Sequence, residues 1–212
     1  MKPRSSADLF TLAPVIPVVV LDDAATAVPL ARALVAGGLP AIEVTLRTEA
    51  GLPAIERIAA EVPGAVVGAG TVTTPAQAAD AAKAGAAFLV SPGCTPTLRE
   101  AMAATGLPFL PGVATASEAL ALLEAGVTAM KFFPAEAAGG RPLLKSLSGP
   151  LPQARFCPTG GITPANAPDY LALPNVGCVG GTWLTPGDAL AAGDWARITA
   201  LATEAAALRP AG

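Results

Sequence analysis

The 212-residue chain contains no histidine. Histidine is the side chain that most often serves as a general base or a zinc ligand near neutral pH. Its absence excludes Ser-His-Asp triads, Cys-His dyads and zinc sites built on histidine. Any acid–base chemistry must therefore be carried out by Glu, Asp, Lys, Tyr or water.

Cysteine and charge are also scarce. The three cysteines, Cys94, Cys157 and Cys178, form no CxxC pair and are odd in number, which favours buried thiols in a reducing compartment. Charged residues make up 14% of the chain and the net charge is −3, so no basic field attracts a nucleic-acid backbone. We expect no nucleic-acid partner, although a few basic groups in a pocket can still hold a small anionic substrate.

Long hydrophobic runs are missing as well. Residues Met1 to Leu12 lack the apolar region of a secretory signal. The apolar stretch Val15–Leu21 is far shorter than the roughly 20 residues that span a bilayer. These observations predict a cytoplasmic protein with no membrane partner.

Short apolar runs alternate with alanine-rich helical stretches along the whole chain. This alternation, at a spacing of roughly 20 to 28 residues, is typical of parallel sheets. The predicted strands are Val15–Val20, Ala41–Arg47, Ala65–Thr71, Ala87–Ser91, Pro108–Gly112, Val127–Phe133, Arg155–Thr159 and Val176–Gly180. The predicted helices between them are Ala24–Ala36, Leu52–Glu61, Pro75–Ala84, Pro96–Ala104, Ser117–Glu124 and Pro164–Leu171.

Eight strands in this arrangement predict an α/β protein with one (β/α)₈ TIM-barrel domain over residues 1–212. We expect the barrel core at about 14–183 and a helical segment from there to about 208, packed either on the barrel or on a neighbouring molecule. A doubly wound open sheet is the competing fold. Its dinucleotide-binding form is not indicated, because the sequence Gly68-Ala-Gly70 lacks the third glycine of that motif.

Polar and apolar side chains alternate in the predicted strand "AIEVTLRT". Because side chains in a strand point to opposite faces in turn, Glu43, Thr45 and Arg47 share one face. We expect that face to point into the barrel and the intervening apolar residues to face the helices. A carboxylate and a guanidinium should therefore enter one interior, either apart or as an ion pair.

Lys131 lies in the predicted strand "TAMKFFPAE", among apolar and aromatic neighbours. Burial there disfavours the charged ammonium form, and a neutral amine can attack a carbonyl carbon. Glu43 supplies the proton acceptor that such an amine needs. The residues alone also allow a structural lysine, either solvated at the strand end or paired with Glu43.

Two predicted strands end in paired glycines, in "CPTGGI" and "CVGGTW". Glycine allows close approach to the backbone N–H groups, and the loops after strands 7 and 8 of a barrel often hold phosphate. A single Gly-Gly pair is usually only a tight turn. Two pairs at matching positions favour a phosphate site.

From about Pro14 to Trp183 the chain resembles the 2-keto-3-deoxy-6-phosphogluconate (KDPG) aldolases, which include the bifunctional 4-hydroxy-2-oxoglutarate (KHG) aldolases. The resemblance lies in "PVIPVVV", "IEVTLRT", "VGAGTV", "VSPG", "PFLPGVAT", "MKFFPAE", "CPTGGI" and "GGTW", in this order. It implies a Schiff-base (class I) aldolase that cleaves KDPG to pyruvate and glyceraldehyde 3-phosphate, with KHG as a second substrate. The residues leave open which of KDPG, its galactonate epimer and KHG is preferred. The resemblance further implies a homotrimer that uses no metal and no organic cofactor.

The resemblance also assigns roles to individual residues. It implies that Lys131 forms the Schiff base, that Glu43 is the general acid and base, and that Arg47 and Thr71 hold the substrate carboxylate. The residues expected to line the pocket are Pro92, Phe133 and Thr159, and those expected at the phosphate end are Gly160, Gly161, Gly180, Gly181 and Thr182. Thr182 departs from the serine of many relatives, because it keeps the hydroxyl but adds a methyl group.

Two other functions remain as alternatives. A phosphate-binding barrel isomerase or decarboxylase could use Glu43 as a base without any covalent intermediate. A ligand-binding barrel without catalysis could hold pyruvate or a sugar phosphate. Only the aldolase requires Lys131 to react with the substrate.

Overall fold

The computed structural model describes residues 3–208; residues 1–2 and 209–212 lie outside this description. The strands are β1 Val15–Val19, β2 Ala41–Thr45, β3 Val66–Gly70, β4 Leu89–Val90, β5 Phe109–Leu110, β6 Gly112–Val113, β7 Ala129–Phe132, β8 Arg155–Pro158 and β9 Val179–Gly181. The α-helices are α1 Leu9–Leu12, α2 Ala27–Ala36, α3 Gly51–Glu61, α4 Pro75–Lys83, α5 Pro96–Ala104, α6 Ala116–Glu124, α7 Gly140–Leu147, α8 Ala167–Leu171, α9 Gly187–Ala192 and α10 Trp195–Ala206. A short 3₁₀ helix, η1 Ala24–Thr26, precedes α2.

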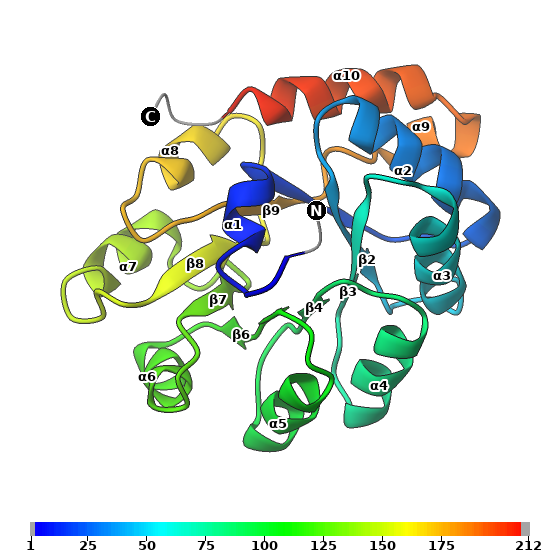
Figure 1. Ribbon diagram of the computed structural model, residues 1–212. Helices are drawn as coiled ribbons and strands as arrows, with labels where there is room; N and C mark the ends of the chain where they lie inside the picture. The colour runs from blue at the N-terminus through cyan, green and yellow to red at the C-terminus, as the bar shows by residue number, and fades with distance from the viewer. Residues whose placement is uncertain (1–2, 209–212) are drawn as a thin grey trace.

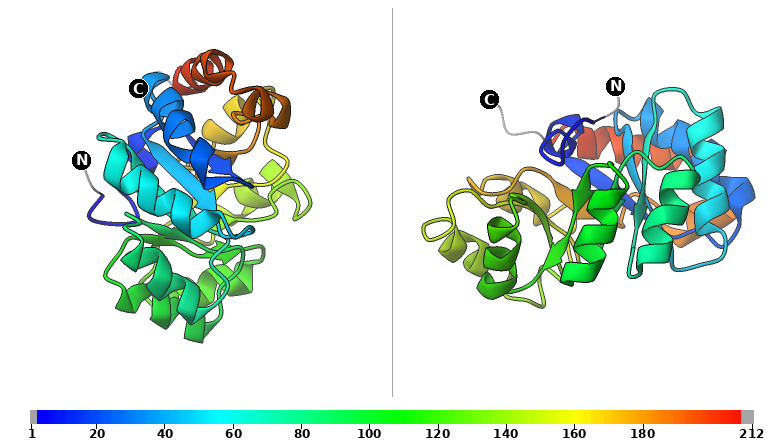
Figure 2. Two further views of the ribbon diagram at one scale, coloured as in Figure 1. Left: turned by 90° about the vertical axis from the view of Figure 1, so that its right-hand side faces the viewer. Right: turned by 60° about the horizontal axis from the view of Figure 1, so that its bottom comes forward.

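All strand pairs are parallel, and together they close into a barrel surrounded by helices (Figures 1 and 2). The order is β5-β4-β3-β2-β1-β9 in one sheet and β6-β7-β8 in the other. Two parallel bridges, Phe156 to Val176 and Thr159 to Gly180, connect β8 to β9. Strands β5 and β6 are separated only by Pro111 and together occupy one strand position of the barrel. The nine labelled strands therefore fill the eight strand positions that the sequence predicts.

The predicted fifth strand, Pro108–Gly112, differs from the structure because it is interrupted at Pro111. Proline has no backbone N–H to donate to a neighbouring strand. Its carbonyl oxygen still accepts a hydrogen bond of 2.9 Å from the N–H of Lys131, so this part of the barrel remains paired with β7. Two helices, α1 and α7, were not predicted from the sequence, and the predicted C-terminal helical segment is divided into α9 and α10.

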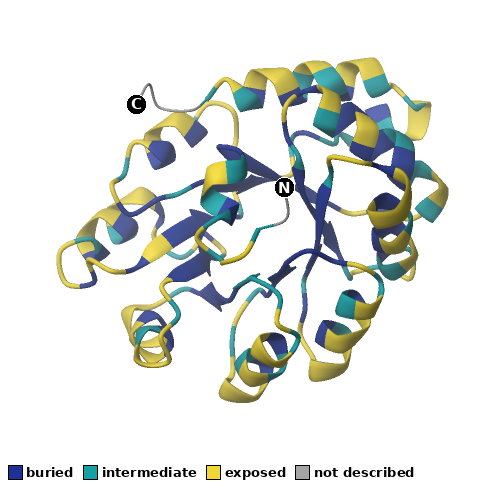
Figure 3. Cartoon of the chain, viewed as in Figure 1, coloured by how far each residue is buried: buried dark blue, intermediate teal, exposed yellow. Residues whose placement is uncertain are grey.

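The buried side chains form two clusters, one inside the barrel and one between the strands and the helices. The strands are almost entirely buried, and each helix has buried residues on one side only (Figure 3). Inner residues such as Ala41 and Ala129 alternate along their strands with outer residues such as Ile42 and Met130. Helix α1 closes the end of the barrel at which the strands begin, where Leu9 is fully buried. The opposite end, where the strands finish, is left for the polar residues described below.

Helix α10 packs on α2, which settles where the C-terminal helical segment lies. A Cβ atom at Gly37 would lie 2.4 Å from the Cβ of Ala202, so only glycine allows this approach. The hydroxyl of Thr199 donates a hydrogen bond of 3.2 Å to the carbonyl oxygen of Ala33. Over residues 3–208, no helix is long and apolar enough to cross a membrane.

Thr74 caps helix α4, and its removal should weaken the fold measurably. Its hydroxyl accepts from the N–H of Gln77 at 3.2 Å, and the Gln77 side chain accepts from the N–H of Thr74 at 3.2 Å. We expect Thr74→Ala to lower the free energy of unfolding by about 1 kcal/mol in urea denaturation, because a first-turn N–H loses its partner. Thr203→Ala is the control, since that hydroxyl only back-bonds to Thr199 within α10. Equal effects of the two changes would contradict the capping role.

Candidate active site

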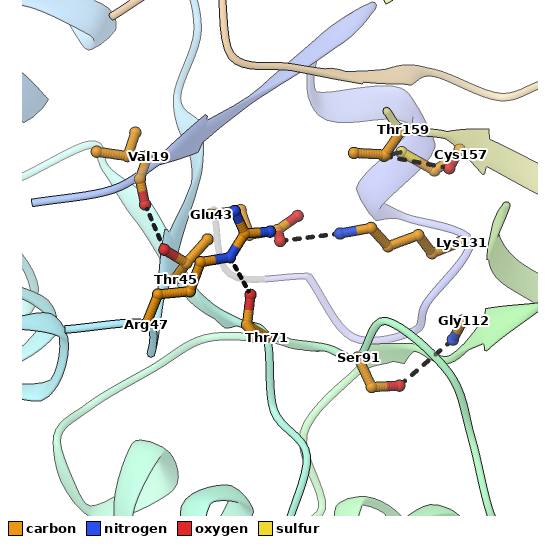
Figure 4. Close-up of polar contacts among 10 residues, drawn as sticks. All are labelled: Val19, Glu43, Thr45, Arg47, Thr71, Ser91, Gly112, Lys131, Cys157 and Thr159. Atoms are coloured by element: carbon orange, nitrogen blue, oxygen red, sulfur yellow. Dashed lines mark hydrogen bonds and ion pairs between the residues drawn. The ribbon is translucent and has the colours of Figure 1, made fainter. Parts of the chain in front are cut away.

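Lys131 and Glu43 form a buried ion pair in the middle of the barrel (Figure 4). The Nζ of Lys131 donates to Oε1 of Glu43 at 3.1 Å, and each side chain is 4% exposed. Both residues occupy the third position of their strands, β7 and β2, and both point inward as the two-residue alternation predicts. The direct contact allows a proton to pass between the amine and the carboxylate.

Glycine in β3 makes room for the Glu43 carboxylate. A Cβ atom at Gly70 would lie 2.2 Å from Oε1 of Glu43, the oxygen that also accepts from Lys131. A Cβ atom at Gly68 would lie 2.4 Å from the ring of Phe88, which fills the interior below. The glycines of "VGAG" thus serve side-chain packing inside the barrel.

Arg47 and Thr71 meet at the rim above the ion pair. The Nε of Arg47 donates to the Thr71 hydroxyl at 3.1 Å (Figure 4). Thr71 has a φ of 56°, which is rare and costly for a β-branched residue and is typical of functional sites. Within the described residues, the carboxylate of Glu43 pairs with Lys131 and not with Arg47.

Arg47 lies beyond the strand on which it was predicted. Strand β2 ends at Thr45, whose hydroxyl donates to the carbonyl oxygen of Val19 at 3.0 Å. Arg47 follows in a turn and is exposed. Its guanidinium is therefore available to an anion that enters from solvent, which a fully interior position would prevent.

The three predicted lining residues lie around the pair in different ways. The ring centroid of Phe133 is 5.3 Å from the Nζ of Lys131, a cation–π contact on its side of β7. Thr159 is buried, with its hydroxyl directed along β8 near Cys157. Pro92 is half-buried at the end of β4, where its backbone would obstruct any side chain at Gly112.

Gly160 and Gly161 form the loop after β8, as predicted. Their φ values are 99° and 79°, a region in which only glycine is unstrained. The carbonyl oxygen of Gly160 accepts from the N–H of Glu136 at 3.1 Å, and that of Gly161 accepts from the Asn166 side chain at 3.0 Å. With no side chains in the way, this loop can bring backbone N–H groups close to an anion.

The second glycine pair lies within a strand, where the prediction placed only Gly180 at the strand end and Gly181 in the loop after it. Gly180 and Gly181 are buried residues of β9. Side chains nearby require the glycines: a Cβ atom at position 180 would lie 2.2 Å from the Thr159 hydroxyl, and one at 181 would lie 1.9 Å from the Trp183 ring. Thr182 is the first residue beyond the strand and is exposed. A cavity of about 420 Å³ opens beside it, next to the end of β1.

Two thiols share the interior with the ion pair. Cys157 and Cys178 are both buried and free. The hydrogen bond with Cys157, together with burial, raises the pKa of the Cys178 thiol well above its ordinary value. Cys178 therefore stays a neutral thiol near neutral pH, and the amine of Lys131 is the better candidate nucleophile.

Several supporting contacts were not predicted from the sequence. Thr45 ties β2 to β1, and the Ser91 hydroxyl accepts from the N–H of Gly112 at 3.3 Å. Glu136 accepts a hydrogen bond from the hydroxyl of Tyr170. These contacts join residues distant along the chain, so no local pattern points to them.

Comparison with known proteins agrees with this geometry. The family model described as KDPG and KHG aldolase matches residues 7–201. The KHG/KDPG aldolase of Escherichia coli is 53% identical over 201 residues, which cover 95% of this chain and 94% of that protein. Such a match extends over the whole barrel and includes every candidate site residue.

Solved structures are equally similar. The KDPG aldolase of Zymomonas mobilis with 3-phosphoglycerate has a TM-score of 0.92 and 50% identity, with 98% of each chain covered. The KDPG aldolase of Legionella pneumophila, with pyruvate captured as a covalent carbinolamine intermediate, has a TM-score of 0.93 and 46% identity, covering 95% of this chain and 98% of that one. The (β/α)₈ barrel is thereby confirmed, and the chain belongs to the KDPG and KHG aldolase family.

Proposed function

We propose that this protein is a Schiff-base aldolase that cleaves KDPG to pyruvate and glyceraldehyde 3-phosphate, and also cleaves KHG to pyruvate and glyoxylate. The observation that carries the proposal is the buried contact of 3.1 Å between the Nζ of Lys131 and the carboxylate of Glu43. It supports the proposal because a candidate nucleophile and a candidate base are in contact inside the barrel, close to the carboxyl ends of β2 and β7, and enzymes with this fold react at that end.

In the first half of the reaction, Lys131 passes a proton to Glu43, and the resulting neutral amine attacks C2 of the 2-keto acid and forms a carbinolamine. Glu43 gives a proton to the departing hydroxyl, water leaves, and a protonated imine (iminium) remains. The iminium nitrogen then accepts the electron pair of the C3–C4 bond as that bond breaks. Glu43, now a carboxylate, takes the proton of the C4 hydroxyl, and the aldehyde product departs.

In the second half, Glu43 gives its proton to C3 of the enamine left on Lys131, which becomes an iminium again. Water adds to C2, and the C2–N bond breaks to release pyruvate and the free amine. Every proton that Glu43 accepts is returned in a later step, so the residue ends as it began. The cycle requires no metal ion and no organic cofactor.

Substrate binding divides between the two ends of the site. Arg47 suits the C1 carboxylate, because a guanidinium can donate two parallel hydrogen bonds to it while Thr71 orients the side chain. Pro92, Phe133 and Thr159 surround the reacting carbons. Gly160, Gly161, Gly180, Gly181 and Thr182 receive the phosphate, with the 160–161 loop as the main donor of backbone N–H groups.

The relatives support this assignment. A covalent carbinolamine with pyruvate was captured in the Legionella pneumophila protein, and 3-phosphoglycerate was bound to that of Zymomonas mobilis. We propose that the present chain acts as a homotrimer, on the family resemblance. The three free thiols support a cytoplasmic location, where cysteines stay reduced.

The direct test supplies purified protein with KDPG or with KHG and measures the pyruvate that is released. We expect pyruvate from both. A non-covalent isomerase or decarboxylase would consume substrate without producing pyruvate and an aldehyde in equal amounts, and a ligand-binding barrel would consume none. Either result would contradict the proposal.

Arg47→Lys should mainly weaken substrate capture. Lysine keeps the positive charge but loses the planar fork, so we expect KM for KDPG to rise on the order of tenfold with a smaller change in kcat. Arg57→Lys is the matched control, since that half-exposed arginine pairs with Glu61 on α3. An unchanged KM in Arg47→Lys would exclude the carboxylate-binding role.

Gly70→Ala should slow the chemical step. The added methyl group would overlap the Glu43 carboxylate and displace it from Lys131. We expect kcat to fall by at least about tenfold, because a misplaced general base loses its contact with the reacting proton. Gly149→Ala is the control, since a Cβ atom there meets nothing within 4 Å. If kcat is retained in a folded Gly70→Ala protein, the position of Glu43 does not limit the reaction.

A further inference from the structure

The backbone conformation of the Gly160–Gly161 loop depends on the groups packed around it. Both residues have positive φ and no side chain, so the conformation must be fixed by neighbouring groups. On one side the Asn166 side chain donates to the carbonyl oxygen of Gly161. On the other side the contacts come from Glu136, four residues after the end of β7.

Glu136 touches both glycines. Its N–H donates to the carbonyl oxygen of Gly160 at 3.1 Å. Its side chain lies directly against Gly161, where a Cβ atom would be 2.6 Å from the Cγ of Glu136. The side chain of Glu136 thus packs directly against Gly161.

Tyr170 fixes the Glu136 side chain. Tyr170 is a fully buried residue of α8, and its hydroxyl donates to Oε1 of Glu136. Gly140 has a φ of 56°, and a Cβ atom there would come within 3.2 Å of the Tyr170 hydroxyl, so the chain at the start of α7 is also shaped around this contact. Burial and the bond to Glu136 raise the pKa of the Tyr170 hydroxyl, which keeps it a donor.

The carboxylate of Glu136 also has an electrostatic consequence. A negative charge beside a phosphate site repels the ligand unless it is turned away or neutralised. The hydrogen bond from Tyr170 commits Oε1 to the side of α8. The bond thereby fixes the side chain that lies against Gly161, and it offsets part of the negative charge.

From these contacts we propose that Glu136 and Tyr170 are positioning residues that hold the Gly160–Gly161 loop in the shape that receives the substrate phosphate. The inference rests on the proposed function and deepens it. Neither residue touches the reacting carbons. Their effect is on the preference for a phosphorylated over an unphosphorylated 2-keto acid.

The test compares KDPG with KHG, which has no phosphate, in Tyr170→Phe, Glu136→Ala and Glu136→Gln. In the first two variants we expect KM for KDPG to rise on the order of tenfold, because supporting residues of this kind typically carry effects of that size. KM for KHG should change less than about twofold, and kcat for both substrates likewise. The inhibition constant of inorganic phosphate against KDPG should rise in parallel.

Glu136→Gln is the rescue variant, since its amide oxygen can still accept from Tyr170 while the charge is removed. We expect it to keep the wild-type KM for KDPG or lower it. Asp169→Ala is the matched control on α8, because it breaks only the exposed ion pair with Arg141. Its kinetic constants should match the wild type.

Two results would overturn the inference. One is an unchanged KM for KDPG in folded Tyr170→Phe and Glu136→Ala proteins. The other is an equal loss for KDPG and KHG, which would indicate a general structural role. Failure of the wild-type protein to cleave KDPG would instead contradict the proposed function, so the two failures are distinguishable.

Discussion

Replacement of Lys131 by methionine should abolish aldol cleavage. Methionine fills nearly the same volume, so the barrel interior stays packed, but it has no amine to form the carbinolamine. We expect kcat for KDPG to fall on the order of 10⁴-fold or more, since loss of a covalent nucleophile removes the whole reaction path. Pyruvate release in a coupled assay measures this.

Lys145→Met is the matched control for this change. Lys145 is an exposed lysine on α7, and its replacement removes the same charge without touching the barrel interior. Its kcat should equal that of the wild type. Activity above about one percent in a folded Lys131→Met protein would show that Lys131 is not the nucleophile.

Breaking the Lys131–Glu43 pair from one side should also destabilise the protein strongly. Lys131→Met leaves the Glu43 carboxylate buried with no counter-charge, and Glu43→Leu leaves the amine in the same state. Each single change is expected to lower the free energy of unfolding by about 3–5 kcal/mol. The double variant, with both charges replaced by apolar groups, should return close to the wild-type value.

Urea unfolding of the four proteins completes this double-mutant cycle. A large coupling energy means that the pair is one unit in which each charge is tolerated because of the other. If the losses of the two single variants simply add in the double variant, the residues are stabilised independently. That result would contradict the direct contact on which the proton transfer depends.

Strand alternation predicted the two central residues correctly. Glu43 and Lys131 lie in strands with a strict period of two, so their inward direction follows from the sequence once a barrel is assumed. The same rule failed for Arg47, because strand β2 ends at Thr45 and the period no longer applies in the turn. The end of a strand depends on where its neighbours stop pairing, which sequence alone does not specify.

The glycine pairs show a second limit. "GGI" and "GGTW" look alike in the sequence, yet Gly160 and Gly161 adopt positive φ in a loop while Gly180 and Gly181 continue a strand. The difference arises from what surrounds them: the Trp183 ring requires space at Gly181. A glycine can signal either backbone freedom or a crowded neighbour, and only the tertiary structure distinguishes the two.

The contacts that support the site from farther away were not predicted. The hydrogen bond between Tyr170 and Glu136 joins residues that are 34 positions apart, with α7 and β8 between them in the chain. Helix α7 was also missed, because it is short and contains Gly140 and Pro142, two residue types that disfavour a helix. Local propensity describes elements, while the support of a site is set by how those elements pack.

Covalent capture of pyruvate is the most direct test of the central proposal. The protein is incubated with pyruvate and borohydride, which reduces an imine to a stable amine, and the modified peptide is mapped by mass spectrometry. We predict a pyruvate-derived adduct on Lys131 and on no other lysine. A folded protein that gains no adduct at saturating pyruvate would contradict the Schiff-base mechanism and leave Lys131 with a structural role only.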